Sequence, residues 1–312
     1  MPDISIIIVS WNTAKLLQEC LESIYTHTKG ITFEIFVVDN ASSDGSARMV
    51  RDLFPGVKLI ENSQNAGFSR ANNQAIVLSE GRYLTLLNPD TLLIEDVFSK
   101  LVNYADQHAD VGAIGPKLFN RDGKTIQYIC ARRLPTLFGS FCYNSGLSIR
   151  YPGSRLLGRT NMTYWDRKTS RDVEAISGAC MMVRRQAVDE VGLMDENQFM
   201  YADDIDWCKR LVDARWRVYY FSDAAILHYG GESSKQMRAL ANLAAVKSTW
   251  YYYRKHGGKA YAYLYVIQIA FFSACKYALT MLPGRDSDET LKEVYRSSML
   301  WSARRLLWSN RE

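Results

Sequence analysis

Apolar, β-branched runs alternate with amphipathic helical segments over residues 4–87, and this alternation limits the fold more than any other feature of the chain. The run at 4–9 is apolar and β-branched apart from Ser5, which is typical of a strand buried on both faces. The pattern predicts an α/β fold with a mostly parallel sheet flanked by helices. The other predicted strands lie at 33–38, 57–60 and 83–87, and the predicted helices begin after Thr13, after Ser43 and at about residue 70.

Polar side chains directly follow three of these strands. Ser10 and Asn12 follow the first strand, Asp39 ends the second, and Asn88 and Asp90 follow the fourth. Ligands of such sheets bind beyond the carboxyl ends of the strands, so we expect a binding site at this edge. The glycine fingerprints of dinucleotide and P-loop sites are absent, which removes support for NAD and ATP chemistry.

The sequence pattern indicates secondary structure less clearly in the middle of the chain. Residues 112–175 are expected to be irregular, with a hairpin turn at 121–124 and a loop that contains Arg132 and Arg133. Regular structure is then predicted to return, as a strand over 173–183 interrupted at 177–179, a helix over 186–191, a strand over 217–221 and a strand-like stretch over 225–228.

An acidic run, Asp203-Asp204-Ile205-Asp206-Trp207, allows two interpretations. Apolar residues follow it at helical spacing, so the acids could cap a helix, whose N-terminal dipole favours negative charge. The lone His228 and the Asn88-Pro89-Asp90 turn suggest instead a site for a hard divalent cation and a general base. The run alone does not decide between them.

Composition limits the partners and the cellular compartment that we expect for the protein. Of the 312 residues 47% are hydrophobic, and much of the net charge of +5 comes from basic residues in the last quarter. A basic, aromatic C-terminal part suggests an anionic membrane surface as a partner, and no nucleic-acid motif is recognisable. The six cysteines form no CxxC pair, which argues against zinc and disulfides and fits a reducing compartment. The first residues lack the pattern of a signal peptide, so we expect a cytoplasmic protein, peripheral on the inner face of the plasma membrane.

A shift in composition beyond Gly231 predicts one domain over 1–232 and a helical, membrane-associating region over 233–312. Residues 260–282 are apolar and aromatic, and their length is close to the ~20 residues that a spanning helix needs. Polar breaks and many tyrosines favour a helix that lies in the membrane interface, while a short span and a helical hairpin packed on the catalytic domain stay open. A basic amphipathic tail over 284–312, which includes Trp308, follows.

Seven short motifs in one order give the chain a family resemblance that covers residues 4–232. Together they resemble the inverting family-two glycosyltransferases of GT-A fold, and within that family the bacterial rhamnosyltransferase-like branch. The motifs are Ile7-Ile8-Val9-Ser10-Trp11-Asn12, Val37-Val38-Asp39-Asn40-Ala41-Ser42, Asn65-Ala66-Gly67-Phe68 with Asn72-Asn73, Leu86-Leu87-Asn88-Pro89-Asp90, Ser177-Gly178-Ala179, Phe199-Met200-Tyr201-Ala202-Asp203-Asp204-Ile205-Asp206 and His228-Tyr229-Gly230-Gly231.

The resemblance implies a metal site and a base. Asp90 and His228 would hold Mn²⁺ or Mg²⁺ against the diphosphate of a sugar nucleotide. Asn88 stands where the family keeps the first acid of its DxD motif, so it would contact sugar or ribose. Asp204 matches the general base that accepts the proton of the attacking hydroxyl. Asp203 would bind that hydroxyl, and an exchange of the two roles stays open.

The resemblance also implies a nucleoside site. Asp39 would accept a hydrogen bond from the base N3–H of uracil or thymine, and Ser10 and Asn12 would lie beneath the nucleoside. The nucleotide would further contact Asn65, Gly67 and Asn72; the alternative for 65–67 is an ordinary turn.

Two adjacent arginines are candidates for contact with the acceptor. Arg132 and Arg133 could clamp an acceptor diphosphate, or they could be a solvated basic pair.

These roles imply transfer of a sugar, with dTDP-L-rhamnose as the expected donor, to a hydroxyl of a polyprenyl-diphosphate-linked saccharide in cell-wall or O-antigen synthesis. A UDP-sugar transferase of the same fold, galactofuranosyl or hexosyl, is the nearest alternative. A sugar-nucleotide pyrophosphorylase would need a glycine-rich loop after Val9, which is missing. A non-catalytic glycan-binding protein would not need Asp90, Asp204 and His228.

Overall fold

The computed structural model describes residues 1–230, 238–282 and 289–307. Gly231, the predicted domain boundary at 232/233 and Trp308 lie outside the described residues. Contacts divide the chain into two compact units. The first unit comprises Met1–Leu134, Trp165–Phe199 and Asp203–Ser233, and the second comprises Pro135–Tyr164, Met200–Ala202 and Ser234–Glu312. The segment Pro135–Tyr164, which the sequence division assigned to the catalytic domain, thus clusters with the C-terminal helices.

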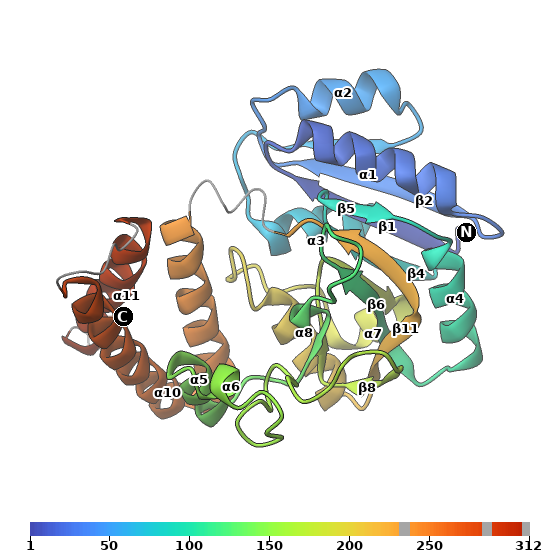
Figure 1. Cartoon of the computed structure of the whole chain (residues 1–312). Coiled ribbons are helices and arrows are strands. Elements are labelled where there is room, and N and C mark those ends of the chain that lie inside the picture. The colour runs from blue at the N-terminus through green and yellow to red at the C-terminus, as the bar shows by residue number, and fades with distance from the viewer. Residues whose placement is uncertain (231–237, 283–288, 308–312) are drawn as a thin grey trace. The chain divides into compact units, whose positions relative to one another are not determined.

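The first unit is built on one large sheet (Figure 1). Its strands, in spatial order, are β3 (Lys58–Glu61), β2 (Phe33–Asp39), β1 (Ile4–Ser10), β4 (Tyr83–Leu87), β10 (Cys180–Arg184), β6 (Val111–Phe119), β11 (Arg217–His228) and β5 (Thr91–Leu93). The short strand β8 (Arg171–Val173) also pairs with β11, and β7 (Ala131–Arg132) pairs with β9 (Ala175–Ile176) in a separate ribbon.

The strand directions bring several strand ends to one edge of the sheet. Strands β1 to β4 are mutually parallel, β10 is antiparallel to both β4 and β6, and β11 is parallel to β6. Because β10 opposes both neighbours, β4 and β6 run in the same direction. The carboxyl ends of β1, β2, β4, β6 and β11 therefore share one edge, where β10 begins. The predicted mostly parallel sheet flanked by helices is confirmed, with a mixed second half.

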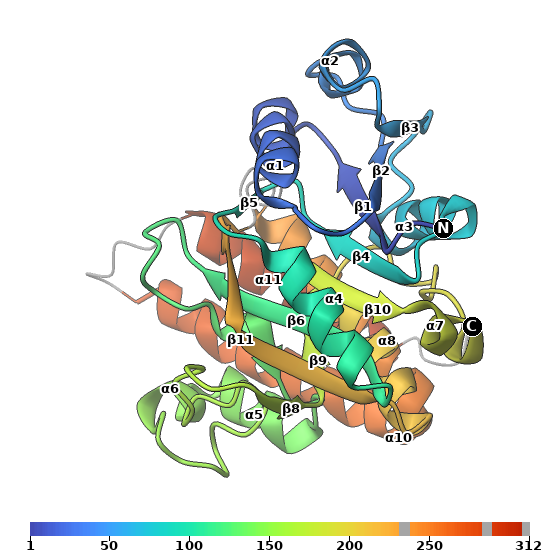
Figure 2. The same ribbon diagram turned by 90° about the vertical axis from the view of Figure 1, so that its right-hand side faces the viewer.

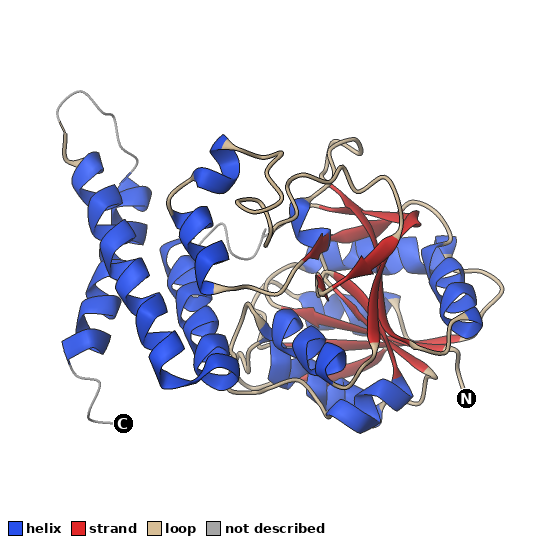
Figure 3. Ribbon diagram, turned by 90° about the horizontal axis from the view of Figure 1, so that it is seen from below, coloured by secondary structure: helices blue, strands red, loops and turns tan. Residues whose placement is uncertain are grey.

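Helices cover both faces of this sheet (Figure 3). Both α4 and α8 contact β6 and β11, and α3 contacts β1 and β2 (Figure 2). The apolar side chains of β1 are fully buried at 4 and 6–8, as the apolar run predicted. The helices of the first unit are α1 (Ala14–His27), α2 (Ser46–Leu53), α3 (Phe68–Leu78), α4 (Val97–Gln107), α7 (Arg185–Val191), α8 (Asp203–Asp213) and the 3₁₀ turn η1 (Tyr128–Cys130).

The prediction of an irregular segment over 112–175 is wrong at its start, because β6 (Val111–Phe119) is a central strand. Gly112, Gly115 and Pro116 interrupt the apolar pattern of this strand, and glycine and proline are common in turns. A Cβ on Gly112 would lie 2.6 Å from the Trp216 side chain, and one on Gly115 would lie 3.2 Å from the backbone of β10. The glycines of this strand are places of close packing, a role that local sequence does not distinguish from a turn.

The hairpin turn predicted at 121–124 is confirmed. The Asp122 carboxylate accepts hydrogen bonds from the backbone N–H groups of Lys124 and Thr125, at 2.9 and 2.8 Å. The chain then returns along β6, where the Gln127 N–H donates to the carbonyl of Leu118 at 2.8 Å. The turn thereby brings Gln127 back beside the end of β6.

The second unit is helical. It contains α5 (Leu137–Asn144), α6 (Leu147–Arg150), α10 (Arg238–Thr280) and α11 (Glu289–Leu307). Gly258, with φ +82°, bends α10 into two helical segments. The Tyr253 and Ser140 hydroxyls, 2.6 Å apart, join α10 to α5, and the rings of Trp250 and Trp301 join α10 to α11.

Within the described residues one helix, Ala239–Thr280, is long and apolar enough by length and composition to cross a membrane, and its apolar 18-residue window has a mean hydropathy of 1.3. The bend at Gly258 leaves residues 259–280 as its straight apolar part. At 1.5 Å per residue this part is about 33 Å long, close to the ~30 Å of a bilayer core.

Gly67, in the loop before α3, can be compared with Gly45. Both have a positive φ, +82° and +86°, but Gly67 has ψ 174°, a conformation that only glycine adopts readily, whereas Gly45 has ψ 9°, which is less strained. A Cβ on Gly67 would lie 2.7 Å from the carbonyl oxygen of Phe199, whereas nothing lies within 4 Å of one on Gly45. We expect Gly45→Ala to cost about 1 kcal/mol and Gly67→Ala about 2 kcal/mol more, in urea unfolding. Equal losses would contradict both the strained backbone and the close contact with Phe199 at Gly67.

Candidate active site

The polar edge of the sheet gathers the predicted residues of the first unit. Asp39 ends β2, Asn88 and Asp90 follow β4, and His228 ends β11. All four are at strand ends that the topology places on the same edge. Asp39, Asp90 and His228 are nonetheless at most 7% exposed. Buried polar groups at a strand-end edge are typical of a ligand site in such sheets.

The Asn88-Pro89-Asp90 turn sets the geometry on one side of the site. The Thr91 hydroxyl donates to the Asn88 carbonyl at 2.7 Å and closes the turn. The turn brings Asp90 Oδ1 to 3.4 Å from His228 Nε2, and Asn88 Nδ2 lies 3.4 Å from the same nitrogen. Three polar side chains therefore converge on one point.

This pair fits a divalent cation. Two ligands at ~2.1 Å from an ion and at right angles to each other are about 3 Å apart, close to the separation of Asp90 Oδ1 and His228 Nε2. In the described part of the chain no cluster of three or more His, Cys, Asp or Glu side chains is arranged to hold a metal. The protein would thus supply two ligands, and phosphate oxygens and water would fill the other positions, as is usual for such ions.

Sequence reasoning missed one residue here. The Gln127 side chain makes two contacts with His228. Its Oε1 lies 2.7 Å from His228 Nδ1, and its Nε2 donates to the His228 backbone carbonyl at 2.7 Å. A single glutamine just past a predicted turn carries no signal for this contact, because the two residues are 101 positions apart.

Asp204 is on the other side of the site, in the first turn of α8. Its carboxylate accepts hydrogen bonds from the backbone N–H groups of Gly178 and Ile205, at 3.1 and 2.8 Å. The Arg132 guanidinium contacts both of its oxygens, at 2.9 and 3.1 Å. Each oxygen thus accepts two hydrogen bonds, and Arg132 is the only one of these donors that is not a backbone group.

The neighbouring arginine differs. Arg133 pairs with Glu174 at 3.1 Å, and the second Glu174 oxygen accepts from the Leu134 N–H. Arg133 thus braces the strand next to the site, while Arg132 faces Asp204.

Asp203 is buried and only partly satisfied. Its Oδ1 accepts from the Asp204 N–H at 3.0 Å, whereas its Oδ2 is buried without a hydrogen-bond partner. Burial, and then the negative charge of Asp204, raise the pKa of Asp203 to about 7. Asp206, the third acid, pairs with Arg210 at 3.0 Å and so belongs to the helix. The acidic run therefore contains both a helix terminus and two acids at the polar edge.

The loop 177–179 connects the two sides. The Asn88 N–H donates to the Ala179 carbonyl at 3.0 Å, and the adjacent Gly178 N–H donates to Asp204. A short backbone path therefore links the Asp90–His228 pair to the Asp204 carboxylate.

On the β2 side, Asp39 retains an open acceptor. Its Oδ2 accepts from the Ser42 N–H at 2.9 Å, while its Oδ1 is buried and has no partner. An unpaired buried carboxylate oxygen is costly unless a ligand donates to it. Asn72, in α3, similarly donates to the Phe68 carbonyl and leaves its Oδ1 without a partner.

Other predicted nucleotide contacts shape the loops in this structure. The Ser10 hydroxyl bonds to Thr13 at 2.9 Å, and Asn12 holds the loop after β2 through Ser43. Asn65 accepts from the Gly67 N–H. Asn40, which was named only within a motif, ties two loops together, because it donates to the Gly67 carbonyl and accepts from Asn62. The roles of all these residues toward a nucleotide stay predictions.

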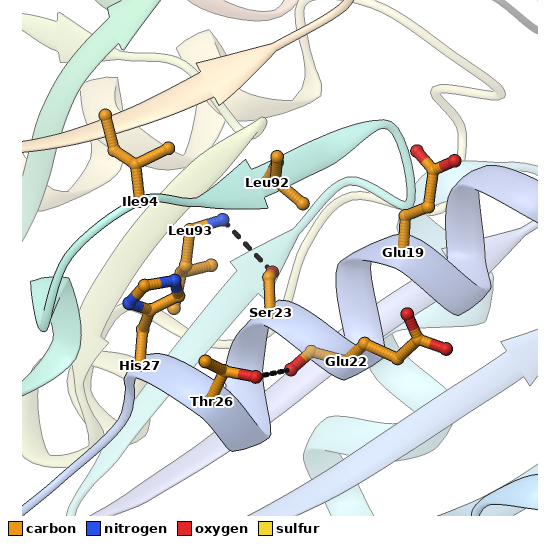
Figure 4. A pocket seen from close by; sticks show the side chains of 8 residues that line it. All are labelled: Glu19, Glu22, Ser23, Thr26, His27, Leu92, Leu93 and Ile94. Atoms are coloured by element: carbon orange, nitrogen blue, oxygen red, sulfur yellow. Dashed lines mark hydrogen bonds between the residues drawn. The ribbon is translucent and has the colours of Figure 1, made fainter.

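A separate open depression lies between α1 and β5 (Figure 4). None of the predicted site residues lines it. Its hydrogen bonds, from Leu93 N–H to Ser23 and from Thr26 to the Glu22 carbonyl, stabilise the elements themselves. It is lined by Glu19, Glu22, Ser23, Thr26, His27, Leu92, Leu93 and Ile94.

Comparison with known proteins agrees with this geometry. The sequence profile of the family "Glycosyl transferase family 2" matches residues 5–192, more than half of the chain. The chain belongs to glycosyl transferase family 2. The predicted family is confirmed, and with it the assignment as a glycosyltransferase.

Two relatives are named as rhamnosyltransferases. The chain is 28% identical to the N-acetylglucosaminyl-diphospho-decaprenol L-rhamnosyltransferase of Mycobacterium tuberculosis, over 81% of this chain and 85% of that protein. It is 24% identical to rhamnosyltransferase WbbL of Escherichia coli (strain K12), over 79% of this chain and 91% of that protein. Both names agree with the predicted branch of the family.

The fold resembles a solved glycosyltransferase. Mannosyltransferase PcManGT from Pyrobaculum calidifontis, solved in complex with GDP-Man and Mn²⁺, superposes with a TM-score of 0.58 at 16% identity, over 99% of this chain and 88% of that one. At this identity the similarity shows the fold, and it confirms the predicted GT-A architecture.

Substitution of Asp203 should change how stability depends on pH. With a folded pKa of about 7, raised from 3.8, the folded state keeps a proton that the unfolded chain loses. The free energy of unfolding therefore falls as pH rises from about 4 to about 7. Asp203→Asn removes this loss, so at pH 8 the variant should be more stable than wild type by about 1–3 kcal/mol and near wild type at pH 4. Urea unfolding at both pH values measures the difference; parallel pH profiles would contradict the burial of an ionisable Asp203.

Proposed function

We propose that this protein transfers L-rhamnose from dTDP-L-rhamnose to a hydroxyl of a polyprenyl-diphosphate-linked saccharide, with inversion at C1. The observation that carries the proposal is the path from Asp204 through the loop 177–179 to Asn88 and the Asp90–His228 pair. It links a carboxylate suited to accept a proton to a pair of groups suited to hold a diphosphate through a cation. The relatives named as rhamnosyltransferases support the choice of sugar and of a lipid-linked acceptor.

The reaction assigns a role to each side of the site. The acceptor oxygen attacks C1 of the donor sugar, the bond from C1 to the diphosphate oxygen breaks, and its electron pair leaves with the diphosphate. Asp204 accepts the proton of the attacking hydroxyl. Asp203, whose Oδ2 has no partner among the described residues, receives a hydrogen bond from the acceptor. Asp39 Oδ1 accepts from N3–H of the thymine base.

Asp90 and His228 would hold Mn²⁺ or Mg²⁺. The ion would offset the negative charge that develops on the leaving diphosphate. Asn88, at 3.4 Å from the same imidazole nitrogen, is close enough to donate to a donor sugar or ribose oxygen beside the ion.

Arg132 is the proposed contact for the acceptor diphosphate. In this structure its guanidinium neutralises Asp204, and its Nε is buried without a partner. A guanidinium binds a diphosphate more strongly than it binds a carboxylate. Transfer of Arg132 from Asp204 to the acceptor would leave lone pairs of Asp204 open for the proton of the hydroxyl.

The second unit supports a peripheral position on the inner face of the plasma membrane. Tyr263, Leu264, Ile267 and Phe271 form one stripe along α10, and each is more than 40% exposed. The opposite side of the helix is buried. Arg254, Lys255 and Lys259, at the bend, are exposed and basic, which suits anionic lipid headgroups. This stripe favours a helix in the interface over a helix that is only packed.

Donor screening tests the proposed reaction. Purified protein with Mn²⁺ and a lipid-linked N-acetylglucosaminyl diphosphate should release TDP from dTDP-L-rhamnose, and EDTA should abolish the release. Release of UDP from UDP-hexoses alone would favour the alternative transferase of the same fold. Release of pyrophosphate instead of a nucleoside diphosphate would indicate a pyrophosphorylase and overturn the proposal.

Asp204→Asn should lower kcat by about a hundredfold or more while leaving donor affinity nearly unchanged, because the variant cannot accept the proton. Asp203→Asn is the matched control, with the same change one residue earlier and a smaller expected loss. Wild-type turnover in Asp204→Asn together with an inactive Asp203→Asn would exchange the two roles.

Flotation with liposomes tests the membrane proposal. The full-length protein should float with anionic vesicles, and added salt should weaken the binding in part, since exposed charges are screened over ~8 Å at physiological ionic strength. Replacement of both Ile267 and Phe271 by Ser should reduce flotation at every salt concentration. If the wild-type protein stays at the bottom of the gradient, α10 serves packing only.

A further inference from the structure

The environment of His228 shows how its ring is oriented. The ring is buried at the end of β11, and Gln127 lies beside it because the 121–124 turn returns the chain along β6. Gln127 makes three side-chain hydrogen bonds there, to His228 Nδ1, to the His228 carbonyl and to Asn120.

Hydrogen-bond chemistry fixes the orientation of the Gln127 amide. Its Nε2 lies 2.7 Å from the His228 carbonyl, which can only accept, and 3.0 Å from Asn120 Oδ1. A carboxamide nitrogen has two hydrogens, and these two acceptors use both. A flipped amide would set its oxygen against the carbonyl and lose that bond. The Gln127 oxygen therefore faces His228 Nδ1.

This orientation determines which ring nitrogen carries hydrogen. The Gln127 oxygen can only accept, so at 2.7 Å His228 Nδ1 must be the donor. In a neutral imidazole the lone pair is then on Nε2. That nitrogen faces Asp90 Oδ1 and Asn88 Nδ2, each at 3.4 Å. A lone pair and a carboxylate oxygen directed at one point form a site that a cation can occupy.

We propose that Gln127 is a positioning residue that holds His228 as the Nδ1–H tautomer and so presents Nε2 to a divalent cation shared with Asp90. The link to the cation rests on the proposed function, whereas the tautomer is a property of the metal-free protein. Gln127 acts through His228 and contacts neither the ion nor the donor.

Nitrogen NMR of the metal-free protein tests the tautomer directly. The chain has four histidines, so ¹⁵N-histidine labelling gives few signals, and His228→Asn identifies the one to follow. At pH 8 wild-type His228 should show a protonated Nδ1 and an unprotonated Nε2, and Gln127→Leu should convert it to a mixture. A protonated Nε2 in wild type, as the Nε2–H tautomer or as imidazolium, would overturn the proposal.

Calorimetry with TDP tests the consequence for the cation. With Mn²⁺ present, Gln127→Leu should weaken TDP binding by about 10–100-fold, the usual loss on removing a residue that orients a ligating histidine. Without Mn²⁺ its affinity should equal that of wild type. Gln18→Leu, at a half-buried glutamine on α1 that donates to Glu22, is the matched control and should bind like wild type.

The two measurements separate the inference from the proposed function. Equal wild-type affinity for TDP with and without Mn²⁺ would contradict the metal site, whatever the NMR shows. Mn²⁺-dependent binding in wild type that Gln127→Leu leaves unchanged would contradict the positioning role and leave the metal site standing.

Discussion

The antiparallel pairing of β10 with both β4 and β6 is the constraint on which the site depends. Because β10 opposes its two neighbours, β4 and β6 run in the same direction, and β11 follows β6. The turn after β4 and the end of β11 therefore meet at one edge, although Asn88 and His228 are 140 positions apart. β10 begins at that edge, so the loop before it supplies Gly178 to Asp204 and Ala179 to Asn88.

Charge is distributed unevenly around this edge. Asp204 is neutralised by Arg132, while Asp203 is buried beside it with one oxygen unpaired. Burial and the Asp204 charge together raise the pKa of Asp203. Arg132 is the side-chain donor of this group, since the other donors to Asp204 belong to the backbone. Under the proposed function, an acceptor diphosphate that binds Arg132 would free Asp204 to act as the base.

The local sequence pattern predicted those helices and strands whose burial follows from their own apolar residues. The strand over 4–9 was predicted from an apolar run, and the next helices from the alternation with such runs; this strand and the helix predicted from about residue 70 are both present. β6 was missed because Gly112, Gly115 and Pro116 carry the composition of a turn. The helix α5 was missed in the same region, since its packing partner α10 is far away in the chain. The secondary structure of β6 and of α5 therefore depends on the elements that pack against them.

The sequence by itself determined the family, the sheet and the acids that end its strands, because short motifs and periodic burial are local properties. Tertiary structure decided which of those polar groups still have open acceptors. It paired Arg132 with Asp204, left Asp39 Oδ1 unpaired and turned Gln127 toward His228. Each of these facts depends on a contact between distant segments. A hydrogen bond between two segments does not show in the residue pattern of either segment.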